Sequence, residues 1–239
     1  RQYEMCYTNI LQVLDLAGIP LRTRDRKKGD TLVIGGGPCS YNPEPIADFF
    51  DIFYMGEGEV SYDALLELYK VYKHSDMTRE EFLIKVSNIP GLYVPELYEV
   101  TYKEDGTIAS FAPRFEDVPA TITKTVVMDH SKVSYPEKPV VSFMKLTQDR
   151  VVLEIMRGCI RGCRFCQAGM IYRPTRPKDV NLLKGYAEKM LASTGHEEIT
   201  FSSLSSSDYE ELPELTDCLI EKMDNEHVNI SLPSLRIDA

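Results

Sequence analysis

Three cysteines fall within eight residues of one another, directly after an apolar run that is typical of a buried strand. The run Val151 to Met156 predicts that strand, and Cys159, Cys163 and Cys166 follow it with the spacing C-x-x-x-C-x-x-C on one glycine-containing loop. Ordinary [4Fe–4S] sites use four cysteines. Three thiolates on one loop can wrap a cuboidal cluster and leave one iron free to bind a reactant.

Other cysteine sites need a ligand that the sequence does not supply nearby. Structural zinc needs four ligands in a closed shell, and no fourth Cys or His stands at a finger-like spacing. A closed electron-transfer cluster would need a distant ligand such as Cys218 or His196. Cys6, Cys39 and Cys218 stand alone, so we interpret them as small buried apolar residues.

The cysteine spacing, Phe165 just before the last cysteine, and the loop's place after a strand resemble the radical S-adenosylmethionine (SAM) superfamily. The segment 156–176 is similar to one uncharacterised subgroup with an N-terminal relative of the cobalamin-binding domain. The resemblance implies that Cys159, Cys163 and Cys166 bind a [4Fe–4S] cluster whose open iron binds SAM. It implies reductive cleavage of SAM to a 5′-deoxyadenosyl radical, which takes hydrogen from a substrate that the sequence does not identify. The implied partner is an electron donor such as a flavodoxin or ferredoxin.

Four further residues are candidate SAM contacts through this resemblance. Phe165 is expected to pack against SAM or the cluster loop. Ser205 and Ser206 follow the second predicted strand, where radical SAM enzymes contact the SAM amino group, often through Gly-Gly-Glu; a serine-rich turn that caps the next helix is the alternative. Arg236 is placed to pair with the SAM carboxylate or a substrate anion, or to form a structural salt bridge with Asp238 or a neighbouring strand.

The second half of the chain alternates strands with helices. After the first strand we expect a helix at 178–193, a strand at 198–202, a helix at 213–225 and a strand at 228–232. Such repeats resemble the opening of a (β/α) barrel. Residues 151–239 are therefore predicted to be the N-terminal portion of a radical SAM partial (β/α) barrel, truncated at its end.

The first half predicts an α/β domain that resembles the cobalamin-domain relative. Helices are expected at 3–17, 43–50 and 60–73, with one strand in the run 31–37 that ends in glycines and another at 51–54, which is a Rossmann-like alternation. Alternating residues around Asp105 and Gly106 predict a β-hairpin. The Asp-x-His-x-x-Gly loop that ligates cobalt in such domains is missing, so cobalamin stays open as a second cofactor. Glu57 and Glu59 are candidate catalytic carboxylates or helix N-terminal acids.

Charge and composition limit the function classes. The formal net charge of -10 argues against bulk binding to nucleic acid or to an anionic membrane. Six basic residues nevertheless lie between Glu154 and Lys178, counting Lys178, and cations lower thiolate pKa values and offset the charge of a thiolate-ligated cluster. No membrane-spanning run or signal peptide is found, and we expect a reducing, cytoplasmic location.

The predicted organisation is thus α/β throughout. Residues 1–112 form the Rossmann-like, cobalamin-domain-like domain with a hairpin extension, residues 113–150 a linker, and residues 151–239 the partial barrel. The abrupt ends suggest an excerpt of a longer protein. The alternatives to a radical SAM enzyme are a non-enzymatic iron–sulfur module for electron relay or docking, and a structural zinc module; SAM cleavage and metal analysis distinguish the three.

Overall fold

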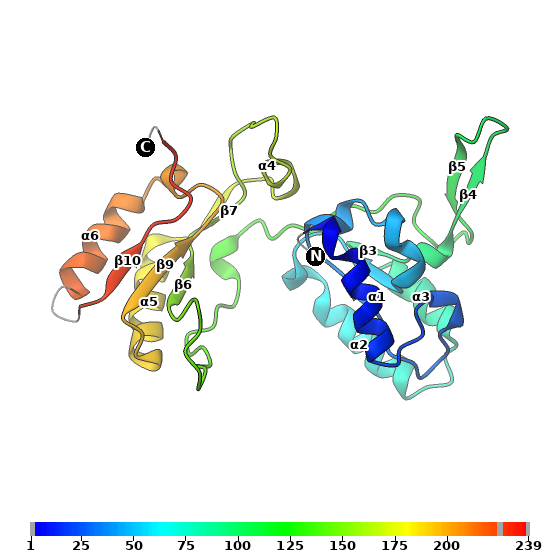
Figure 1. Cartoon of the computed structure of the whole chain (residues 1–239), viewed down its shortest axis with the longest axis horizontal. Helices are drawn as coiled ribbons and strands as arrows, with labels where there is room; N and C mark the ends of the chain where they lie inside the picture. The colour runs from blue at the N-terminus through cyan, green and yellow to red at the C-terminus, as the bar shows by residue number, and fades with distance from the viewer. Residues whose placement is uncertain (1–2, 224–226, 238–239) are drawn as a thin grey trace. The chain divides into compact units, whose positions relative to one another are not determined.

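The chain forms two compact units in the computed structural model, which describes residues 3–223 and 227–237 (Figure 1). Unit 1 is Arg1–Val127 and unit 2 is Met128–Ala239. Each unit has its own cluster of buried apolar side chains, so each has the core of an independent domain. The boundaries given above for domains and linker stay predictions. None of the helices in the described residues has the length and apolar character required to span a membrane.

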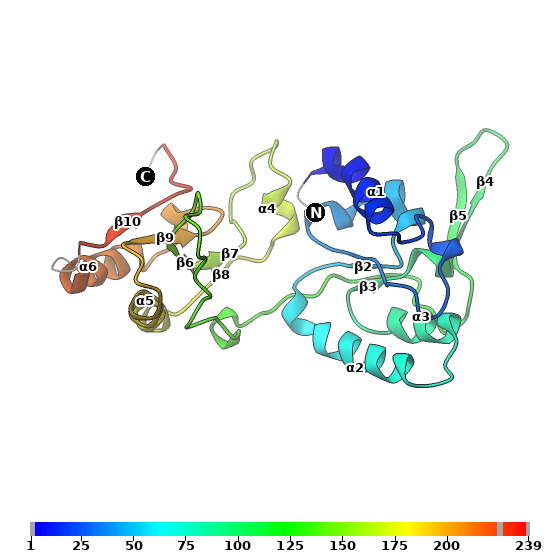
Figure 2. The ribbon, with the colours of Figure 1, turned by 60° about the horizontal axis from the view of Figure 1, so that its bottom comes forward.

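Helices cover both faces of the small sheet of unit 1 (Figure 2). The strands, in sheet order, are β1 (Ile34–Gly35), β2 (Ile52–Tyr54) and β3 (Leu92–Tyr93). The helices are α1 (Tyr7–Leu16) on one face, and α2 (Tyr62–Lys73) and α3 (Arg79–Ser87) on the other. β1 and β2 run parallel and β3 pairs antiparallel with β2, so the sheet is mixed. The sequence predicted the two parallel strands and missed β3 and α3.

Two features of unit 1 differ in detail from the expected elements. The helix expected at 43–50 is a 3-10 helix, and a second one precedes it; prolines at 38, 43 and 45 lack the N–H that an α-helix interior requires. The expected hairpin is formed by β4 (Tyr98–Tyr102) and β5 (Ile108–Pro113). Short 3-10 helices are Glu4–Cys6, Thr23–Asp25, Pro38–Tyr41, Glu44–Phe49, Gly58–Val60 and Pro95–Leu97 in unit 1, and His130–Lys132 and Ser206–Asp208 in unit 2.

The loop after β2 holds the last residues of unit 1. Gly56 forms a parallel bridge with Thr125, and a Cβ on Gly56 would lie 2.2 Å from the carbonyl oxygen of Thr125. Only glycine permits this approach. The carboxylate of Glu57 accepts a hydrogen bond from the backbone N of Val127 at 2.6 Å. Glu57 therefore holds backbone in place in this structure.

Unit 2 is built on three parallel strands. In sheet order they are β10 (Asn229–Ser231), β9 (Glu198–Ser202) and β6 (Val151–Glu154). They are connected by α5 (Val180–Thr194) and α6 (Leu212–Met223). This is the strand and helix order that the sequence predicts for the start of a (β/α) barrel, and the sheet is not closed within the described residues.

The two faces of this sheet differ in exposure. Val151 and Leu153 of β6 and Ile199 and Phe201 of β9 are buried in one core with residues of α5 and α6. The alternate positions point to the other face, where Val152 is 39 % exposed. The helices therefore cover one face, and the other is partly open.

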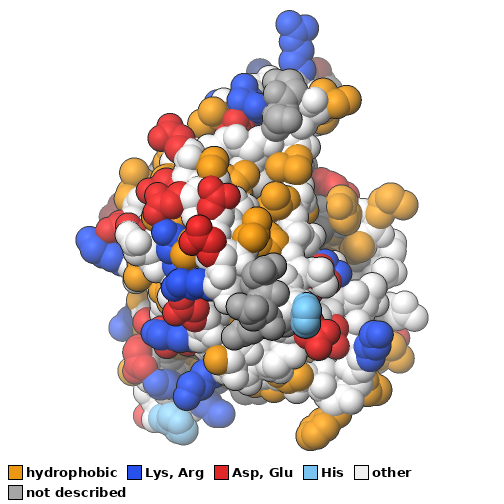
Figure 3. Space-filling view, turned by 90° about the vertical axis from the view of Figure 1, so that its left-hand side faces the viewer, with side chains coloured by type: hydrophobic (Ala, Val, Ile, Leu, Met, Phe, Trp, Pro, Cys, Tyr) orange, Lys and Arg blue, Asp and Glu red, His pale blue; other side chains and the backbone are white. Residues whose placement is uncertain are grey.

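The two edges of the sheet are also unequal. On the free edge of β6, the Tyr135 hydroxyl donates to the Val152 carbonyl at 2.7 Å and accepts from the Glu154 N–H at 3.0 Å. Beside β10 there is an open hollow of about 790 Å³. It is lined by Thr216, Ile220, His227, Val228, Asn229, Ile230 and Leu232. Figure 3 looks at the molecule from the side of α6 and shows hydrophobic side chains next to a band of acidic ones.

Candidate functional site

The cysteine loop leaves the sheet at the carboxyl end of β6 and returns beside its own start. The strand predicted to reach Met156 ends at Glu154. Ile155 still donates its N–H to the Ser202 carbonyl of β9 at 3.0 Å, and Met156 pairs instead with Pro177. Two-residue strands β7 (Met156–Arg157) and β8 (Arg176–Pro177) then pair antiparallel and close the loop. The short helix α4 (Ala168–Ile171) lies inside it.

All three predicted ligands lie on this loop as free thiols. Cys159 and Cys166 are half-buried and Cys163 is exposed. The backbone N of Arg161 donates to Sγ of Cys159 at 3.4 Å, and the N–H of Cys166 donates to the carbonyl of Cys163 at 3.0 Å. Over residues 3–223 and 227–237, no three His, Cys, Asp or Glu side chains are arranged to hold a metal ion.

The donor set fits a cluster better than a single ion. Each thiolate of an iron–sulfur cluster ligates a different iron, so its cysteines need not converge on one point as they do around zinc. The loop offers three reduced sulfurs and no carboxylate or imidazole between Cys159 and Cys166. The residues present therefore fit a cluster held by three thiolates.

A glycine fixes the entry to the loop. Gly158 has φ +81°, and a Cβ there would lie 2.5 Å from the carbonyl oxygen of Pro174 and 2.8 Å from that of Tyr172. The outgoing and returning parts of the loop therefore meet at a position without a side chain. Gly162, beside Cys163, has no atom within 4 Å of the Cβ position.

Charged side chains hold the residue that precedes Gly158. Both carboxylate oxygens of Glu154 accept from Arg157, Oε1 from Nε at 2.8 Å and Oε2 from Nη2 at 3.1 Å. His130, whose side chain is fully buried, contacts the same carboxylate. Burial alone raises the pKa of Glu154, but the hydrogen bonds and charges of His130 and Arg157 outweigh it and lower the pKa to about 2.

The other predicted SAM contacts lie in different environments. Phe165 is 93 % exposed, on the same loop as the thiols. Ser205 and Ser206 are buried after β9. The Ser205 hydroxyl donates to Asp208 at 2.8 Å, and that of Ser206 donates to the carbonyl of Pro233 at 2.8 Å. These hydroxyls thus bind the turn itself and the chain after β10, and their assignment to SAM stays a prediction.

Arg236 forms an ion pair, with Asp208. Its Nη1 lies 2.9 Å from Oδ1 of Asp208, a residue of the loop that follows β9. Asp238, the partner considered from sequence, lies outside the described residues. Asp208 also accepts two hydrogen bonds from Arg161 of the cysteine loop. The sequence analysis did not single out Asp208. The local pattern is an acidic residue at the end of a run of serines, and such residues are common at turns.

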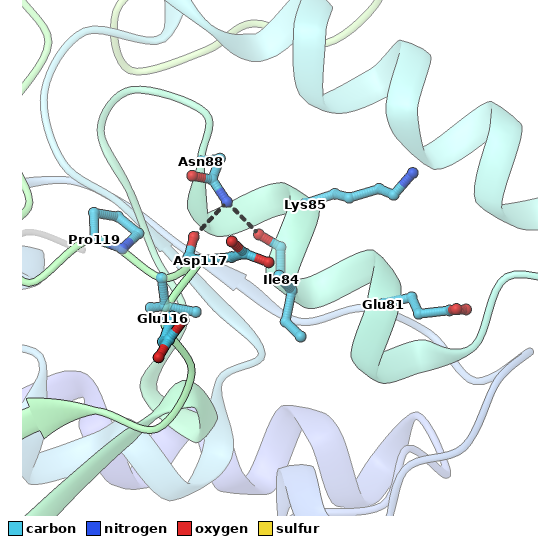
Figure 4. Close-up of a pocket in the computed structure, with 8 residues that line it drawn as sticks. Glu81, Ile84, Lys85, Asn88, Glu116, Asp117 and Pro119 are labelled. Atoms are coloured by element: carbon cyan, nitrogen blue, oxygen red, sulfur yellow. Dashed lines mark hydrogen bonds between the residues drawn. The ribbon is translucent and has the colours of Figure 1, made fainter.

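Unit 1 has an open hollow of its own, of about 720 Å³ (Figure 4). It is lined by Glu81, Ile84, Lys85, Asn88, Glu116, Asp117, Val118 and Pro119. The Asn88 amide donates to the carbonyls of Ile84 and Asp117, both at 2.9 Å, and so joins α3 to the chain after β5. The hydrogen bonds of Asn88 thus connect two backbone segments of unit 1. None of the residues that line the hollow is a cysteine.

Two family models match the chain. Residues 1–95 match the model for radical SAM proteins, N-terminal, and residues 153–239 match that of the radical SAM superfamily. The second match contains all three cysteines of the loop. An uncharacterized protein of Methanocaldococcus jannaschii, MJ0966, is 29 % identical over 240 residues, which cover 99 % of this chain and 43 % of that protein. The chain thus spans less than half the length of this relative.

One solved structure shows the same kind of fold. The cobalamin-dependent SAM radical enzyme OxsB, solved with aqua-cobalamin and SAM bound, aligns with a TM-score of 0.54 at 15 % identity, over 95 % of this chain and 28 % of that one. The radical SAM methyltransferase TsrM from Kitasatospora setae, solved with cobalamin and a [4Fe–4S] cluster, aligns over 94 % of this chain and 40 % of that one, with a TM-score of 0.49 at 13 % identity. From the two family matches, with the cysteine motif inside the second, the chain belongs to the radical SAM superfamily.

Proposed function

We propose that this chain is part of a radical SAM enzyme in which Cys159, Cys163 and Cys166 hold a [4Fe–4S] cluster. The observation that carries the proposal is the cysteine loop itself. Three free thiols lie on one loop at the carboxyl end of a parallel strand, and the β7–β8 pair closes that loop. Ligand sites of α/β folds form at this end of the strands.

If a reduced cluster and SAM were bound there, the cluster would supply the one electron that cleaves the sulfonium, and the resulting 5′-deoxyadenosyl radical would abstract hydrogen from the substrate. The chain's part is to hold and orient. Glu154 fixes Arg157 at the start of the loop, and Gly158 lets the two ends of the loop meet. Phe165 offers an exposed aromatic face beside Cys166, and Arg236 offers a guanidinium after β10. These two residues are our candidates for contact with SAM.

The decisive experiment uses the full-length protein, reconstituted anaerobically with iron and sulfide. After reduction with dithionite and addition of SAM, 5′-deoxyadenosine is measured by liquid chromatography. The expected result is nucleoside formation by the wild type and none by a variant with Cys159, Cys163 and Cys166 all changed to Ala.

A matched control removes cysteines outside the loop. The Cys6→Ala, Cys218→Ala double variant changes two half-buried thiols and should keep both iron content and nucleoside formation. A wild-type cluster that forms and never cleaves SAM would contradict the enzyme proposal and favour an electron-relay or docking module. Stoichiometric zinc in place of iron would favour the structural zinc module.

Cobalamin is not part of the proposed function. His74 is the single histidine of unit 1, and it lies exposed at the end of α2. His130 belongs to unit 2 and contacts Glu154. We therefore propose that no histidine of unit 1 ligates cobalt. A visible spectrum of the protein with cobalamin that changes in the wild type and not in His74→Ala would contradict this.

A further inference from the structure

One carboxylate joins the loops that follow all three parallel strands of unit 2. Asp208, whose side chain is 5 % exposed, accepts from Arg161 through Nε at 3.1 Å and Nη2 at 2.5 Å. It also accepts from Arg236 Nη1 at 2.9 Å and from the Ser205 hydroxyl at 2.8 Å. We call these four residues the Asp208 junction.

The junction lies where the chain topology brings distant segments together. Arg161 follows β6, Asp208 follows β9 and Arg236 follows β10, and these strands are parallel neighbours. Their carboxyl ends therefore meet at one edge of the sheet. Arg161 stands between Cys159 and Cys163, so the junction ties the cysteine loop to the other two strand ends.

Backbone bonds fix the position of Arg236 in this junction. The Ser206 N–H donates to the carbonyl of Ser234 at 3.2 Å, and the Arg236 N–H donates to the Ser207 hydroxyl at 3.1 Å. Ser206 is fully buried. The turn that contains Ser206 and Ser207 thus holds the chain after β10 beside Asp208. Backbone hydrogen bonds therefore support the Asp208–Arg236 ion pair.

Both ion pairs of the junction depend on Asp208, because its carboxylate is the acidic partner in each. Two partly exposed guanidinium groups share one nearly buried carboxylate, so loss of that carboxylate removes an interaction partner of both arginines. A bidentate arginine–carboxylate pair also fixes orientation, because two parallel hydrogen bonds allow little rotation. Replacement of Asp208 would therefore remove a bidentate restraint on Arg161, which stands between the first two cysteines, while the bond from Arg173 to the Arg161 carbonyl remains.

We propose that Asp208 is a positioning residue for the cofactor site: it orients Arg161 and Arg236 and restrains the cysteine loop before the cluster is bound. This inference rests on the proposed function, in which the three thiols bind the cluster. The competing explanation is an ion pair that stabilises unit 2 as a whole and leaves the loop unaffected.

The first test needs no activity. Full-length apoprotein, reduced and kept under anaerobic conditions, is treated with iodoacetamide, and the alkylation rate of each cysteine is followed by peptide mass spectrometry. Asp208→Asn should raise the rate at the half-buried Cys159 by at least about fivefold, because the loop opens more often, whereas the exposed Cys163 should change little. Cys6, in unit 1, should keep its rate in every variant and serves as the internal reference.

Four variants separate positioning from general destabilisation. Arg161→Gln changes an exposed side chain and should reproduce the effect of Asp208→Asn, and the double variant should be no faster than either, because both lose the same interaction. Asp208→Glu should restore part of the restraint. Glu210→Gln, an exposed acid nearby, should behave like the wild type.

Cofactor loading gives the second readout. After reconstitution, Asp208→Asn should hold less iron and show an altered electron paramagnetic resonance spectrum, and the KM for SAM should rise by more than kcat falls. If Asp208→Asn and Arg161→Gln alkylate and load iron like the wild type, the positioning role is overturned, whatever their melting temperatures. If the wild type takes up no cluster, the proposed function fails, and the alkylation rates alone still decide the role of Asp208.

Discussion

Nε2 of His130 lies 3.1 Å from Oε2 of Glu154, and this contact joins the start of unit 2 to the end of β6. The two residues are far apart in the chain, and Arg157 completes the set at the entry of the cysteine loop. The contact couples the protonation of one carboxyl group to the stability of unit 2.

The first prediction is a dependence of stability on acid pH. His130 and Arg157 lower the pKa of Glu154 from its ordinary value of 4.5 to about 2, against the effect of burial. This contribution is fully present above about pH 4.5 and is lost as the pH falls towards 2. It amounts to about 2 kcal/mol after allowance for solvent screening. The contribution is measured by urea titrations of the apoprotein at a series of pH values, with hydrogen exchange in α5 as the probe.

Glu154→Gln is the matching variant for that prediction. It should be less stable than the wild type at neutral pH, and the difference between the two should shrink as the pH falls towards 2. A difference that stays constant between pH 6 and pH 2.5 would contradict the role of Glu154 ionisation.

The second prediction concerns the hydroxyl that covers the edge of β6. Tyr135→Phe keeps the ring that stacks on Tyr186 and removes the bonds to Val152 and Glu154. The free energy of unfolding of unit 2 should fall by about 1–2 kcal/mol, since two backbone groups lose their partner. Tyr102→Phe, at an exposed position of β4 in unit 1, should leave the free energy of unfolding of unit 2 unchanged. Equal stabilities of the two variants would refute the prediction.

The third prediction concerns a buried ion pair of unit 1. The side chains of Asp51 and Arg26 are fully buried, and Asp51 accepts from Arg26 at 2.8 Å, from Arg79 at 2.6 Å and from the N–H of Val33 at 2.6 Å. Asp51→Asn leaves the Arg26 charge uncompensated and should cost about 3–5 kcal/mol, measured by hydrogen exchange of β2.

Asp48→Asn is the control for Asp51→Asn. Asp48 pairs with Arg22 on the surface, where both side chains are exposed, so its loss should cost under about 1 kcal/mol. The Asp51 prediction fails if the two variants lose the same amount of protection.

The fourth prediction uses two glycines of the cysteine loop. Gly158→Ala places a Cβ against the carbonyls of Pro174 and Tyr172 at a positive φ, and should lower iron content after reconstitution by more than about half. Gly162→Ala meets no atom within 4 Å and should load iron like the wild type. Iron and sulfide analysis of both variants checks this, and equal loading would show that the loop ends need not meet at Gly158.

Local patterns were sufficient for much of unit 2. The apolar run Val151 to Met156 and the segment Glu198–Ser202 predicted two strands, and the helices after them were predicted as well. The cysteine spacing likewise identified the candidate ligands, because all three stand on one short segment.

The contacts that position the site left no local pattern. Asp208 meets Arg161 across 47 positions of the chain, and Tyr135 meets Val152 across 17, so neither pair shows in any window of sequence. β3, with two residues, was too short to give a period, and it pairs antiparallel where the surrounding alternation favoured parallel strands. Long-range pairs and very short strands are therefore what the sequence alone could not provide.

The unequal edges of the unit 2 sheet have a consequence for assembly. The Tyr135 hydroxyl already occupies the backbone groups of Val152 and Glu154 on the β6 side, whereas no strand pairs with the outer edge of β10 among the described residues. Backbone pairing with a further strand can therefore happen on one side only. Tyr135 therefore sets the direction in which this sheet can grow: a further strand, from this protein or from a partner, can add beside β10 and not beside β6.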